Sequence, residues 1–498
     1  MGNNYGVISL LPVFLTIFLA IKYKKINMAL LAGTVLGVLI LHKGNPYTTI
    51  ISFFADYMIP TIADSWNVKM LLLMFFITAW VKLLEASGGT YAFANSMASK
   101  INTKVKAELA AWVVGLLIFF SDIGSALMTG TILRPIFDRL NVSREKLAWI
   151  ADTTASPWSI MVPFLGWAAY IMGLMAKELP NREMFPLLMK SHLFNYYAAF
   201  SILFGIVVIL SRRDFKIMAE ADERAKNGII HPKDLDVSGV KELELNDITK
   251  KNANIWVMVI PVLVFIGTLF VFQPLGFPFA KGSASGIELT LILSSVLAAI
   301  CSIALMKFYK IANLSEGVGI FYQGIKDSMD IILLLVFAWM VGGTTKALGA
   351  PNFIISLIKG NVPLYLIPTM IFIAGMLISF STGSSWGTFA IMMPFSIPLA
   401  LEVDSNMLPI AIGAVLSGGL FGDHCSPISD TTILAASGAG CHLWAHVRTQ
   451  MPYAMYVAFF SIVSYIIITI YRSPIILPLV FVIMSILYIF IAKPSNSK

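Results

Sequence analysis

Four acidic residues lie inside long apolar stretches of the sequence. They are Asp122, Asp152, Asp423 and Asp430. An acid at the centre of a membrane helix costs about 2.5–3.5 kcal/mol on insertion scales, so such residues usually face a cavity, a partner or a cation. A simpler interpretation is that some of them cap broken helices, because Asp and Ser accept hydrogen bonds from the free N–H groups at a helix start.

Hydroxyl, glycine and proline residues surround these acids in the stretches 152–157 (DTTASP) and 422–432 (GDHCSPISDTT). Carboxylate, hydroxyl and backbone carbonyl oxygens suit a hard cation such as sodium, and carbonyl groups become available where a membrane helix is unwound. Pro157 and Pro427 lack an N–H group and disfavour helix at the preceding residue, so they mark the expected helix breaks. We therefore predict a site for sodium, protons or a substrate at two helix breaks.

The candidate site residues lie at these breaks and in two further runs of small polar residues. In the first half of the chain they are Ser121, Asp122, Gly124, Ser125, Asp152, Thr153, Thr154 and Ser156. In the second half they are Ser381, Thr382, Gly383, Ser384, Ser385, Asp423, His424, Ser426, Ser429, Asp430 and Thr431. Trp158 and Trp386 adjoin the breaks and could line the cavity, although packing is the more common role of a buried tryptophan.

His424 is the one histidine that the sequence places inside the cavity. Its ordinary pKa of about 6.5 would allow proton exchange near neutral pH, although a structural role is more common for a single histidine. A carboxylate could carry the proton instead, and competition between sodium and a proton for one carboxylate would by itself produce antiport.

A metal site is the weaker interpretation of the histidines and cysteines. His442 and His446 have the i, i+4 spacing of zinc ligands, but we expect both at the inner membrane surface, near Arg448. No second tight pair of Cys or His completes a site, so no structural metal is predicted. A membrane metalloenzyme built on Asp423, His424 and Cys425 is the least favoured alternative, and no enzyme activity is expected.

Apolar runs of membrane-spanning length dominate the chain. The 498 residues are 58% hydrophobic and only 12% charged, whereas soluble domains carry about 25% charged residues. This composition predicts an all-α, multi-pass protein of the cytoplasmic membrane. The net charge of +8 comes from basic residues between the apolar runs, so it reflects orientation in the membrane and predicts no nucleic-acid partner.

Two apolar stretches, 107–137 and 363–401, are interrupted near their middles by serine and glycine. We interpret each as a re-entrant hairpin, because irregular backbone within a membrane is tolerated only beside protein or a wet cavity. A broken helix follows each hairpin, at 147–175 and 408–436. This recurrence predicts an internal duplication.

The duplication divides the chain into two transmembrane repeats, 1–211 and 253–472, joined by a cytoplasmic linker at 212–252 and followed by an extra C-terminal span and tail at 473–498. Five spans and a hairpin in each repeat, with the extra span, give about eleven crossings. An odd number of crossings per repeat makes the second repeat inverted. Most of the 35 lysines and arginines then lie on one side, which predicts an outside N-terminus and an inside C-terminus.

The run 422–432, with His442, His446, Thr449, Gln450, Pro452 and Tyr453, resembles the signature of NhaC-type sodium/proton antiporters. The stretch 121–157 is similar to the first-half counterpart in that family. The resemblance implies membership of the ion transporter superfamily, with inverted repeats, paired re-entrant hairpins, elevator-like alternating access and sodium coupling, usually in a homodimer. It leaves the substrate open, because relatives include exchangers of malate for lactate and carriers of amino acids.

We therefore expect a secondary active sodium/proton antiporter with no cofactor, in which sodium is the coupling ion or the substrate. The alternative is a sodium-coupled carrier or exchanger of a small organic acid or amino acid that uses the same site.

Overall fold

The structure is a computed structural model that describes residues 5–23, 25–98, 101–179, 182–232, 234–235, 254–272, 287–350, 352–353, 356, 362–471 and 476–494. Most of this part of the chain is helical, as predicted. Two short strands, β1 (Arg213–Asp214) and β2 (Lys493–Pro494), pair antiparallel. The end of the predicted linker, 236–252, and the last residues of the predicted tail, 495–498, lie outside the described residues.

The first half of the chain and the described part of the linker contain fourteen α-helices joined mostly by short connections. They are α1 (Leu11–Tyr23), α2 (Ile26–Leu41), α3 (Pro46–Ser52), α4 (Ile59–Ala63), α5 (Ser65–Ala86), α6 (Gly89–Ala98), α7 (Lys104–Leu117), α8 (Asp122–Arg139), α9 (Arg144–Thr153), α10 (Ser156–Ser159), α11 (Gly166–Glu178), α12 (Met184–His192), α13 (Tyr196–Ser211) and α14 (Lys216–Lys226). A π-helical turn, Phe53–Met58, joins α3 to α4.

The second half has the same character. Its described α-helices are α16 (Trp256–Phe272), α17 (Ile287–Phe308), α18 (Leu314–Asp327), α19 (Met329–Ala347), α21 (Ile367–Thr382), α22 (Ser385–Val403), α23 (Leu408–Cys425), α24 (Asp430–Ala439), α25 (Leu443–Tyr471) and α26 (Ile476–Ile491). Among the described residues, eight helices are long and apolar enough to cross a membrane, or up to ten if each of two bent pairs is one span. The polytopic membrane fold is therefore confirmed, while the count of about eleven crossings stays a prediction.

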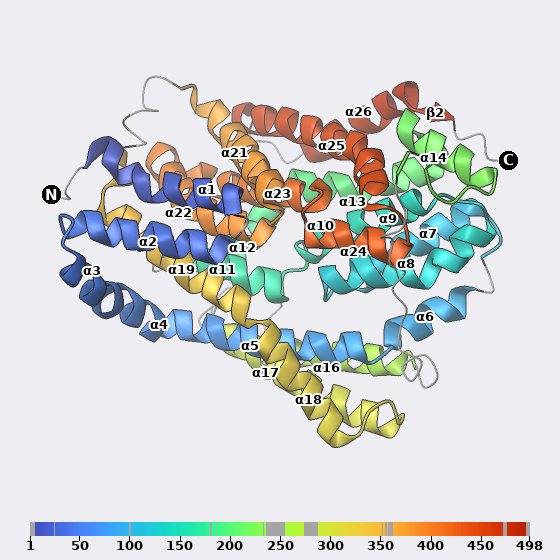
Figure 1. The fold of residues 1–498 in the computed structure, drawn as a ribbon, viewed down its shortest axis with the longest axis horizontal. Coiled ribbons are helices and arrows are strands. Elements are labelled where there is room, and N and C mark those ends of the chain that lie inside the picture. Colours follow the sequence, from blue (N-terminus) through green and yellow to red (C-terminus); the bar gives the residue numbers. More distant parts are fainter. Residues whose placement is uncertain are drawn as a thin grey trace.

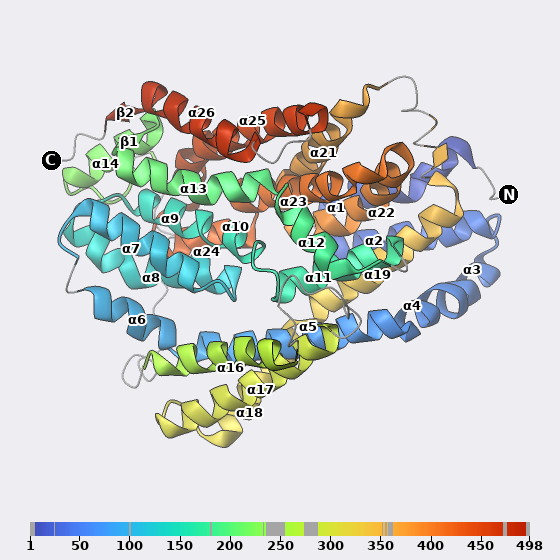
Figure 2. The ribbon, with the colours of Figure 1, turned by 180° about the vertical axis from the view of Figure 1, so that it is seen from behind.

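Helices α5, α16, α17 and α18 form a layer along one edge of the molecule (Figure 1), and the reverse view shows α16 and α17 beside α5 (Figure 2). Here α18 packs on α5 so closely that a Cβ atom on Gly324 would lie 2.5 Å from Ala79 Cα. The amphipathic stretch of α18 thus rests on the end of α5 that contains Lys82 and Glu85. Helices α25 and α26 pack together along the opposite edge.

Two helical hairpins occupy the predicted stretches. In the first, α7 ends at Leu117 and α8 begins at Asp122, with Ser121 as the N-cap whose Oγ accepts a hydrogen bond from Gly124 N at 2.9 Å. In the second, α21 ends at Thr382 and α22 begins after the N-cap Ser384, whose Oγ accepts from Gly387 N at 3.2 Å. A serine at each tip satisfies the free N–H groups that an interrupted membrane helix exposes.

Two broken helices cross beside these hairpins. The first break separates α9 from α10 at Thr154 and Ala155, and Pro157 lies in the first turn of α10. The second break, 426–429, separates α23 from α24 and contains Pro427. Both breaks therefore fall where a proline follows a serine, as the sequence predicts.

Glycines allow the hairpins and the broken helices to approach each other closely. A Cβ atom on Gly422 of α23 would lie 2.0 Å from Phe380 N in α21, and one on Gly438 of α24 would lie 2.3 Å from Leu127 O in α8. Because hydrophobic driving force between helices is absent in lipid, such close packing is a main source of helix association. The first hairpin thus packs on the second broken helix, and the second hairpin packs on the same helix at its other arm.

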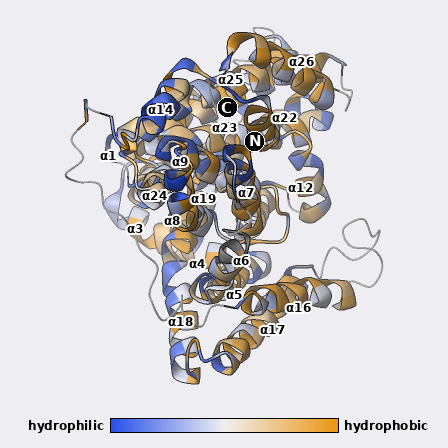
Figure 3. Ribbon diagram, turned by 90° about the vertical axis from the view of Figure 1, so that its right-hand side faces the viewer, coloured by the Kyte–Doolittle hydropathy of each residue, from blue (hydrophilic) through white to orange (hydrophobic). Residues whose placement is uncertain are grey.

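Hydrophilic residues gather on α14 and on the start of α9, whereas α16, α17 and α26 are mostly hydrophobic (Figure 3). The linker helix α14 and the strand β1 hold the start of α9 through buried polar contacts. Ser143 Oγ donates to Asp222 Oδ1 at 2.5 Å, Arg224 pairs with Glu145 at 2.6 Å, and Lys146 pairs with Asp214. The linker is therefore docked on the helical core where its residues are described.

Candidate functional site

Asp152 lies at the end of α9, beside α25, and its side chain is fully buried. Its Oδ2 accepts a hydrogen bond from Gln450 Nε2 at 2.8 Å and lies 3.2 Å from His446 Nε2. Gln450 Nε2 also donates to the backbone carbonyl of His424 in α23. One glutamine therefore ties the end of the first broken helix to the second broken helix, close to its break.

Both ring nitrogens of His424 contact polar side chains from the first half of the chain. Its Nε2 lies 3.0 Å from Thr153 Oγ1, and its Nδ1 lies 2.8 Å from Tyr197 OH of α13. The two ring nitrogens thus both have partners, which supports a positioning role for the ring and leaves the proton on either nitrogen compatible with the contacts.

Asp423 lies one residue before His424 and is 3% exposed. Its Oδ1 accepts a hydrogen bond from Ser429 Oγ at 2.9 Å, and its backbone carbonyl accepts from Thr431 Oγ1 and Thr432 Oγ1, each at 3.2 Å. The hydroxyl groups after the break therefore fold back on the residue before it, and they leave a compact set of oxygens around Asp423.

The carboxylates of Asp122 and Asp430 lie within electrostatic reach of Asp423. Ser156 Oγ is 3.5 Å from Asp122 Oδ2 and close to Asp423 as well. Asp122 comes from the tip of the first hairpin and Ser156 from the first broken helix, so three elements meet at this point. Asp423 is buried, Asp122 is partly buried and Asp430 is exposed. The three acids repel one another, and a cation or bound protons at Asp423 would relieve that repulsion.

Two buried oxygens near Asp152 accept no hydrogen bond from the described residues. They are Asp152 Oδ1 and Gln450 Oε1. A buried polar atom without a partner costs free energy and calls for an explanation such as a bound ion. Carboxylate, amide and hydroxyl oxygens in this arrangement are suitable ligands for sodium. Among the described residues, no group of three or more His, Cys, Asp or Glu side chains has the geometry to hold a metal ion.

The two hairpin tips place their predicted residues differently. Ser125 Oγ donates to Gly115 O at 3.0 Å within the first hairpin, and Ser385 Oγ donates to Gly419 O of α23 at 3.2 Å. Thr382 Oγ1 donates to Ile378 O within its own helix at 2.8 Å, and a Cβ on Gly383 would lie 2.7 Å from Ile428 O. The second tip therefore covers the second helix break, but most of its hydroxyl groups serve local structure. Ser426 Oγ likewise donates to Phe380 O at 2.7 Å.

The two tryptophans singled out from the sequence are both part of tight packing. Trp158 Nε1 donates to Leu116 O of the first hairpin at 2.8 Å. Trp386 packs against Trp167 with the rings tilted by 35° and 4.4 Å between their centroids, and its backbone carbonyl accepts from Tyr170 OH at 2.8 Å. Of the two, only Trp386 lines a described pocket, a space of about 200 Å³ that also touches Ser121 and Asp122.

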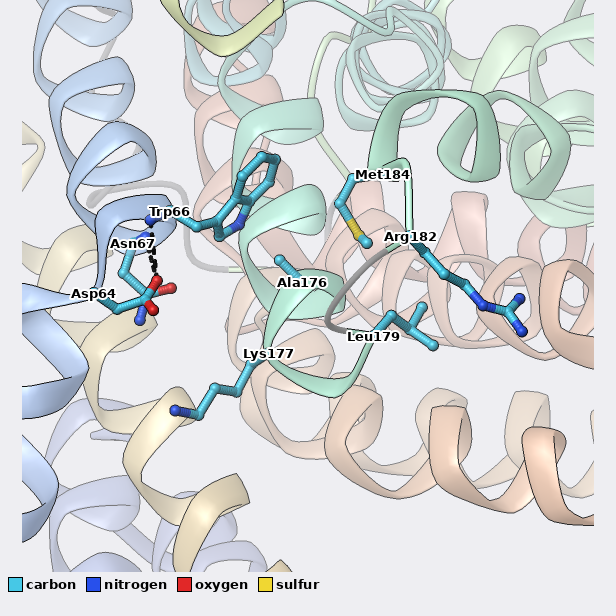
Figure 4. Close-up of a pocket in the computed structure, with 8 residues that line it drawn as sticks. All are labelled: Asp64, Trp66, Asn67, Ala176, Lys177, Leu179, Arg182 and Met184. Atoms are coloured by element: carbon cyan, nitrogen blue, oxygen red, sulfur yellow. Dashed lines mark hydrogen bonds between the residues drawn. The ribbon is translucent and has the colours of Figure 1, made fainter. Parts of the chain in front are cut away.

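A second pocket, of about 340 Å³, lies at the N-terminal end of α5 (Figure 4). Asp64 accepts hydrogen bonds there from Trp66 N and Asn67 N and so caps α5. Lys177 lines the same pocket from the last turn of α11, and Arg182 lines it from the segment between α11 and α12. None of the four intramembrane acids found in the sequence contributes to it, so the pocket belongs to the periphery of the site.

We expected His446 at the inner membrane surface. In the structure its side chain is fully buried within the protein, and its depth in the membrane stays a prediction. Helix α25 begins at Leu443, and His446 lies near its start, where it faces the core. One face of this part of α25 is accessible, because Arg448 is about half exposed, whereas Thr449 and Gln450 are buried. The charge of Arg448 indicated a position at the membrane surface. The opposite face of α25, which contains His446 and Gln450, packs in the core of the protein.

Three further residues of the site were not among the candidate site residues, although Gln450 belongs to the stretch that resembles the family signature. Tyr197 contacts His424, Gln450 contacts Asp152, and Glu85 of α5 accepts a hydrogen bond from Ser121 Oγ. Glu85 lies directly after an apolar run of the sequence, so an acid at the end of such a run was the available signal. Tyr197 lies in an apolar run without any such signal.

A model of the Na+/H+ antiporter family matches residues 160–470. An uncharacterised protein of Haemophilus influenzae is 30% identical over 483 residues, which cover 93% of this chain and 91% of that protein. The malate-2H+/Na+-lactate antiporter of Bacillus subtilis is 34% identical over 167 residues, or 33% of this chain and 34% of that protein.

Among solved structures, the YdaH transporter of Alcanivorax borkumensis is similar, with a TM-score of 0.58 over 86% of this chain and 90% of that chain. The sequence identity is 13%, so the similarity concerns the fold alone. The resemblance to NhaC-type antiporters is confirmed by the matched relatives. The chain thus belongs to the Na+/H+ antiporter family, and it is an integral, multi-pass membrane transporter rather than an enzyme.

Proposed function

We propose that this transporter exchanges sodium for protons at the crossing of its two broken helices. The observation that carries the proposal is the pair of buried acids at the two breaks. Asp152 is contacted by the side chains of Gln450 and His446, and Asp423 is contacted by the hydroxyl groups of Ser429, Thr431 and Thr432. Sodium and a proton would compete for these carboxylates, because bound sodium favours the charged form and desolvation favours the protonated form. Such competition couples the two fluxes without any cofactor.

The proposed mechanism is elevator-like alternating access in which the hairpins and the broken helices move together. The close glycine contacts at Gly422 and Gly438 join each hairpin to the second broken helix, which favours movement as one body. The layer of α5, α16, α17 and α18 would then be the stationary part. We further propose the inverted repeats 1–211 and 253–472, the outside N-terminus and a homodimer, which follow from the sequence pattern and the family resemblance.

The test uses pure protein in liposomes with an internal pH dye, a sodium gradient, a clamped membrane potential and no organic solute. Wild-type protein should move protons when sodium is added, and Asp423→Asn should fall to the rate of protein-free liposomes while remaining monodisperse. Glu402→Gln, which changes an exposed acid of α22, is the matched control and should keep the wild-type rate. Wild-type flux in Asp423→Asn would exclude the assignment.

The second candidate function is sodium-coupled transport of a small organic solute. The observation that favours it is the pocket of about 200 Å³ beside Asp122, because its two tryptophans and its charged groups exceed what a bare ion requires. The Bacillus subtilis relative is a malate-2H+/Na+-lactate antiporter, and exchange of organic acids by a relative is consistent with such a role. Proton movement that starts only after an organic solute is added would favour this candidate.

A further inference from the structure

The pocket of about 200 Å³ lies where three parts of the molecule meet. The first hairpin contributes its tip, α5 contributes one face near its C-terminal end, and the junction of α18 and α19 closes the third side. Both halves of the chain therefore line it, since Asp327 and Trp386 come from the second half. A movement of the hairpins relative to the layer of α5 and α18 would open or close this space.

Three carboxylates and one ammonium group line the pocket. Lys82 Nζ is 2.8 Å from Asp327 Oδ2 and 3.9 Å from Glu85 Oε2. Glu85 also accepts the hydrogen bond from Ser121, and Asp122 follows Ser121 at the tip. The pocket has three acids and one lysine, so its formal charge is negative when the acids are ionised, and an ionised pocket attracts a cationic group.

The charged side chains remain partly accessible from the pocket. The exposed fractions of the Lys82, Asp327 and Glu85 side chains are 38%, 37% and 24%. An incoming ligand can therefore reach Glu85 and Asp327 without first unfolding a helix, and it can replace Lys82 as the partner of either acid.

The opposite wall is aromatic. The rings of Trp167 and Trp386 are in contact, and the hydrogen bond from Tyr170 OH to Trp386 O fixes the start of α22. Tryptophan faces attract organic cations as well as apolar groups. The volume is below the roughly 300–1,000 Å³ of pockets for drug-sized ligands, so it suits a metabolite of a few heavy atoms.

We infer that this pocket binds a small organic solute that carries an ammonium group, with the ammonium between Glu85 and Asp327 and the apolar part against Trp386. The inference rests on the second candidate function, transport of an organic solute. Because Asp122 belongs both to this pocket and to the acid group around Asp423, solute binding would sense whether a cation is bound there. A dicarboxylate such as malate would instead meet three like charges.

The experiment measures binding directly, in detergent and without any ion gradient. The probes are labelled phenylalanine and lysine, their amines phenethylamine and cadaverine, and malate and lactate as anions. Binding of the amino acids or of the amines, but not of the anions, is expected, and the comparison of each pair shows whether the carboxylate of an amino acid is also recognised. Binding of malate or lactate alone would overturn the inference.

Three variants test the placement of the ammonium group. Glu85→Gln keeps an acceptor for Ser121 but removes a charge, and it should weaken binding of the ammonium probe at least tenfold. Lys82→Met removes the competing cation and should tighten binding several-fold, whereas a site for anions would lose affinity. Glu402→Gln should bind like wild type. Unchanged affinity in Glu85→Gln, or loss of affinity in Lys82→Met, would overturn the placement.

The liposome assay separates failure of this inference from failure of the proposed antiport. If sodium drives proton movement without organic solute and none of the probes binds, the antiport stands and the inference is wrong. If ammonium probes bind while sodium alone moves no protons, the inference stands. The proposal that the protein exchanges sodium for protons without an organic solute is then wrong.

Discussion

The two helical hairpins share one construction but meet different surroundings. Each tip has a serine that caps the second helix of the hairpin, Ser121 in the first and Ser384 in the second. The first tip is followed by an acid, Asp122, and reaches Glu85 of α5. The second tip has no acid and lies on the second helix break, where Gly383 approaches the carbonyl of Ile428. The cap is thus the common structural part, and the acid at the first tip is the specialised part.

The two broken helices also differ in the number of charged residues at their starts. The first begins with three charged residues, Arg144, Glu145 and Lys146, which are all buried against other parts of the chain. The second begins at Leu408 with a proline in its first turn and no charged residue there. The first half therefore contains the charged contacts to the linker and to α5, while the second half supplies the apolar helix and the hydroxyl-rich break.

The largest effect should follow from making the first tip resemble the second. In Asp122→Ser the carboxylate at the tip is lost, so the acids around Asp423 no longer share its charge and the pocket loses one of its acids. We expect at least a tenfold fall in sodium-driven proton flux in liposomes. The matched variant at the second tip, Ser385→Ala, changes the residue that follows the cap there and should change the flux less than twofold. Equal losses of proton flux in the two variants would show that the two tips contribute equally to transport.

The buried pair of Lys146 and Asp214 should have the next largest effect, on stability. Lys146→Met leaves the carboxylate of Asp214 buried and without its cation, and breaking such a pair costs about 3–5 kcal/mol. The measurement is thermal unfolding of the purified protein. A midpoint unchanged from wild type would show that the linker is not held by this pair.

The control for this variant is Arg448→Ala. The Arg448 guanidinium, hydrogen-bonded to Asp234, holds the pKa of that carboxyl below its usual range. Because the pKa of Asp234 is lowered in the folded protein, the pair stabilises the fold at neutral pH. This stabilisation is lost only as the pH falls through the lowered pKa. Because both side chains are about half exposed, water and salt screen the pair, and no measurable shift of the unfolding midpoint is expected at pH 7.

Alanine variants at the two close glycine contacts test whether the two hairpins are packed equally well. Gly422→Ala and Gly438→Ala each place a Cβ atom at 2.0–2.3 Å from backbone atoms, which forces helices apart and should cost roughly 1–3 kcal/mol or more. Gly343→Ala of α19, where nothing lies within 4 Å, is the control and should not destabilise. Thermal unfolding should show similar losses for Gly422 and Gly438, and a loss in only one would show that one hairpin is loosely held.

The smallest effect should come from the caps. Ser384→Ala removes one cap and should cost about 1 kcal/mol. Ser121→Ala removes the equivalent cap and also leaves Glu85 without its hydroxyl donor, so it should cost more than Ser384→Ala. Unfolding midpoints compared side by side check the order. If Ser384→Ala costs more, the contact between Ser121 and Glu85 contributes little to stability.

Local features of the fold could be predicted from the sequence because their causes are local. The breaks near Pro157 and Pro427 and the tips at Ser121 and Ser384 depend on residue types that interrupt or cap a helix wherever they occur. The roles of the candidate residues in transport stay predictions. The partners of Asp152 could not be predicted, because His446 and Gln450 are almost three hundred residues away in the chain and only tertiary packing brings them to it.

The distance along the chain between these residues also matters during synthesis of the protein. Asp152 and its partner His446 are 294 residues apart in the chain. At the usual speed of translation this separation corresponds to roughly 15–60 s between the synthesis of the two residues. During this interval the first half sits in or near the membrane with an acid that has no partner. The period before α25 is made is therefore the stage at which the nascent chain is most vulnerable to misinsertion and degradation.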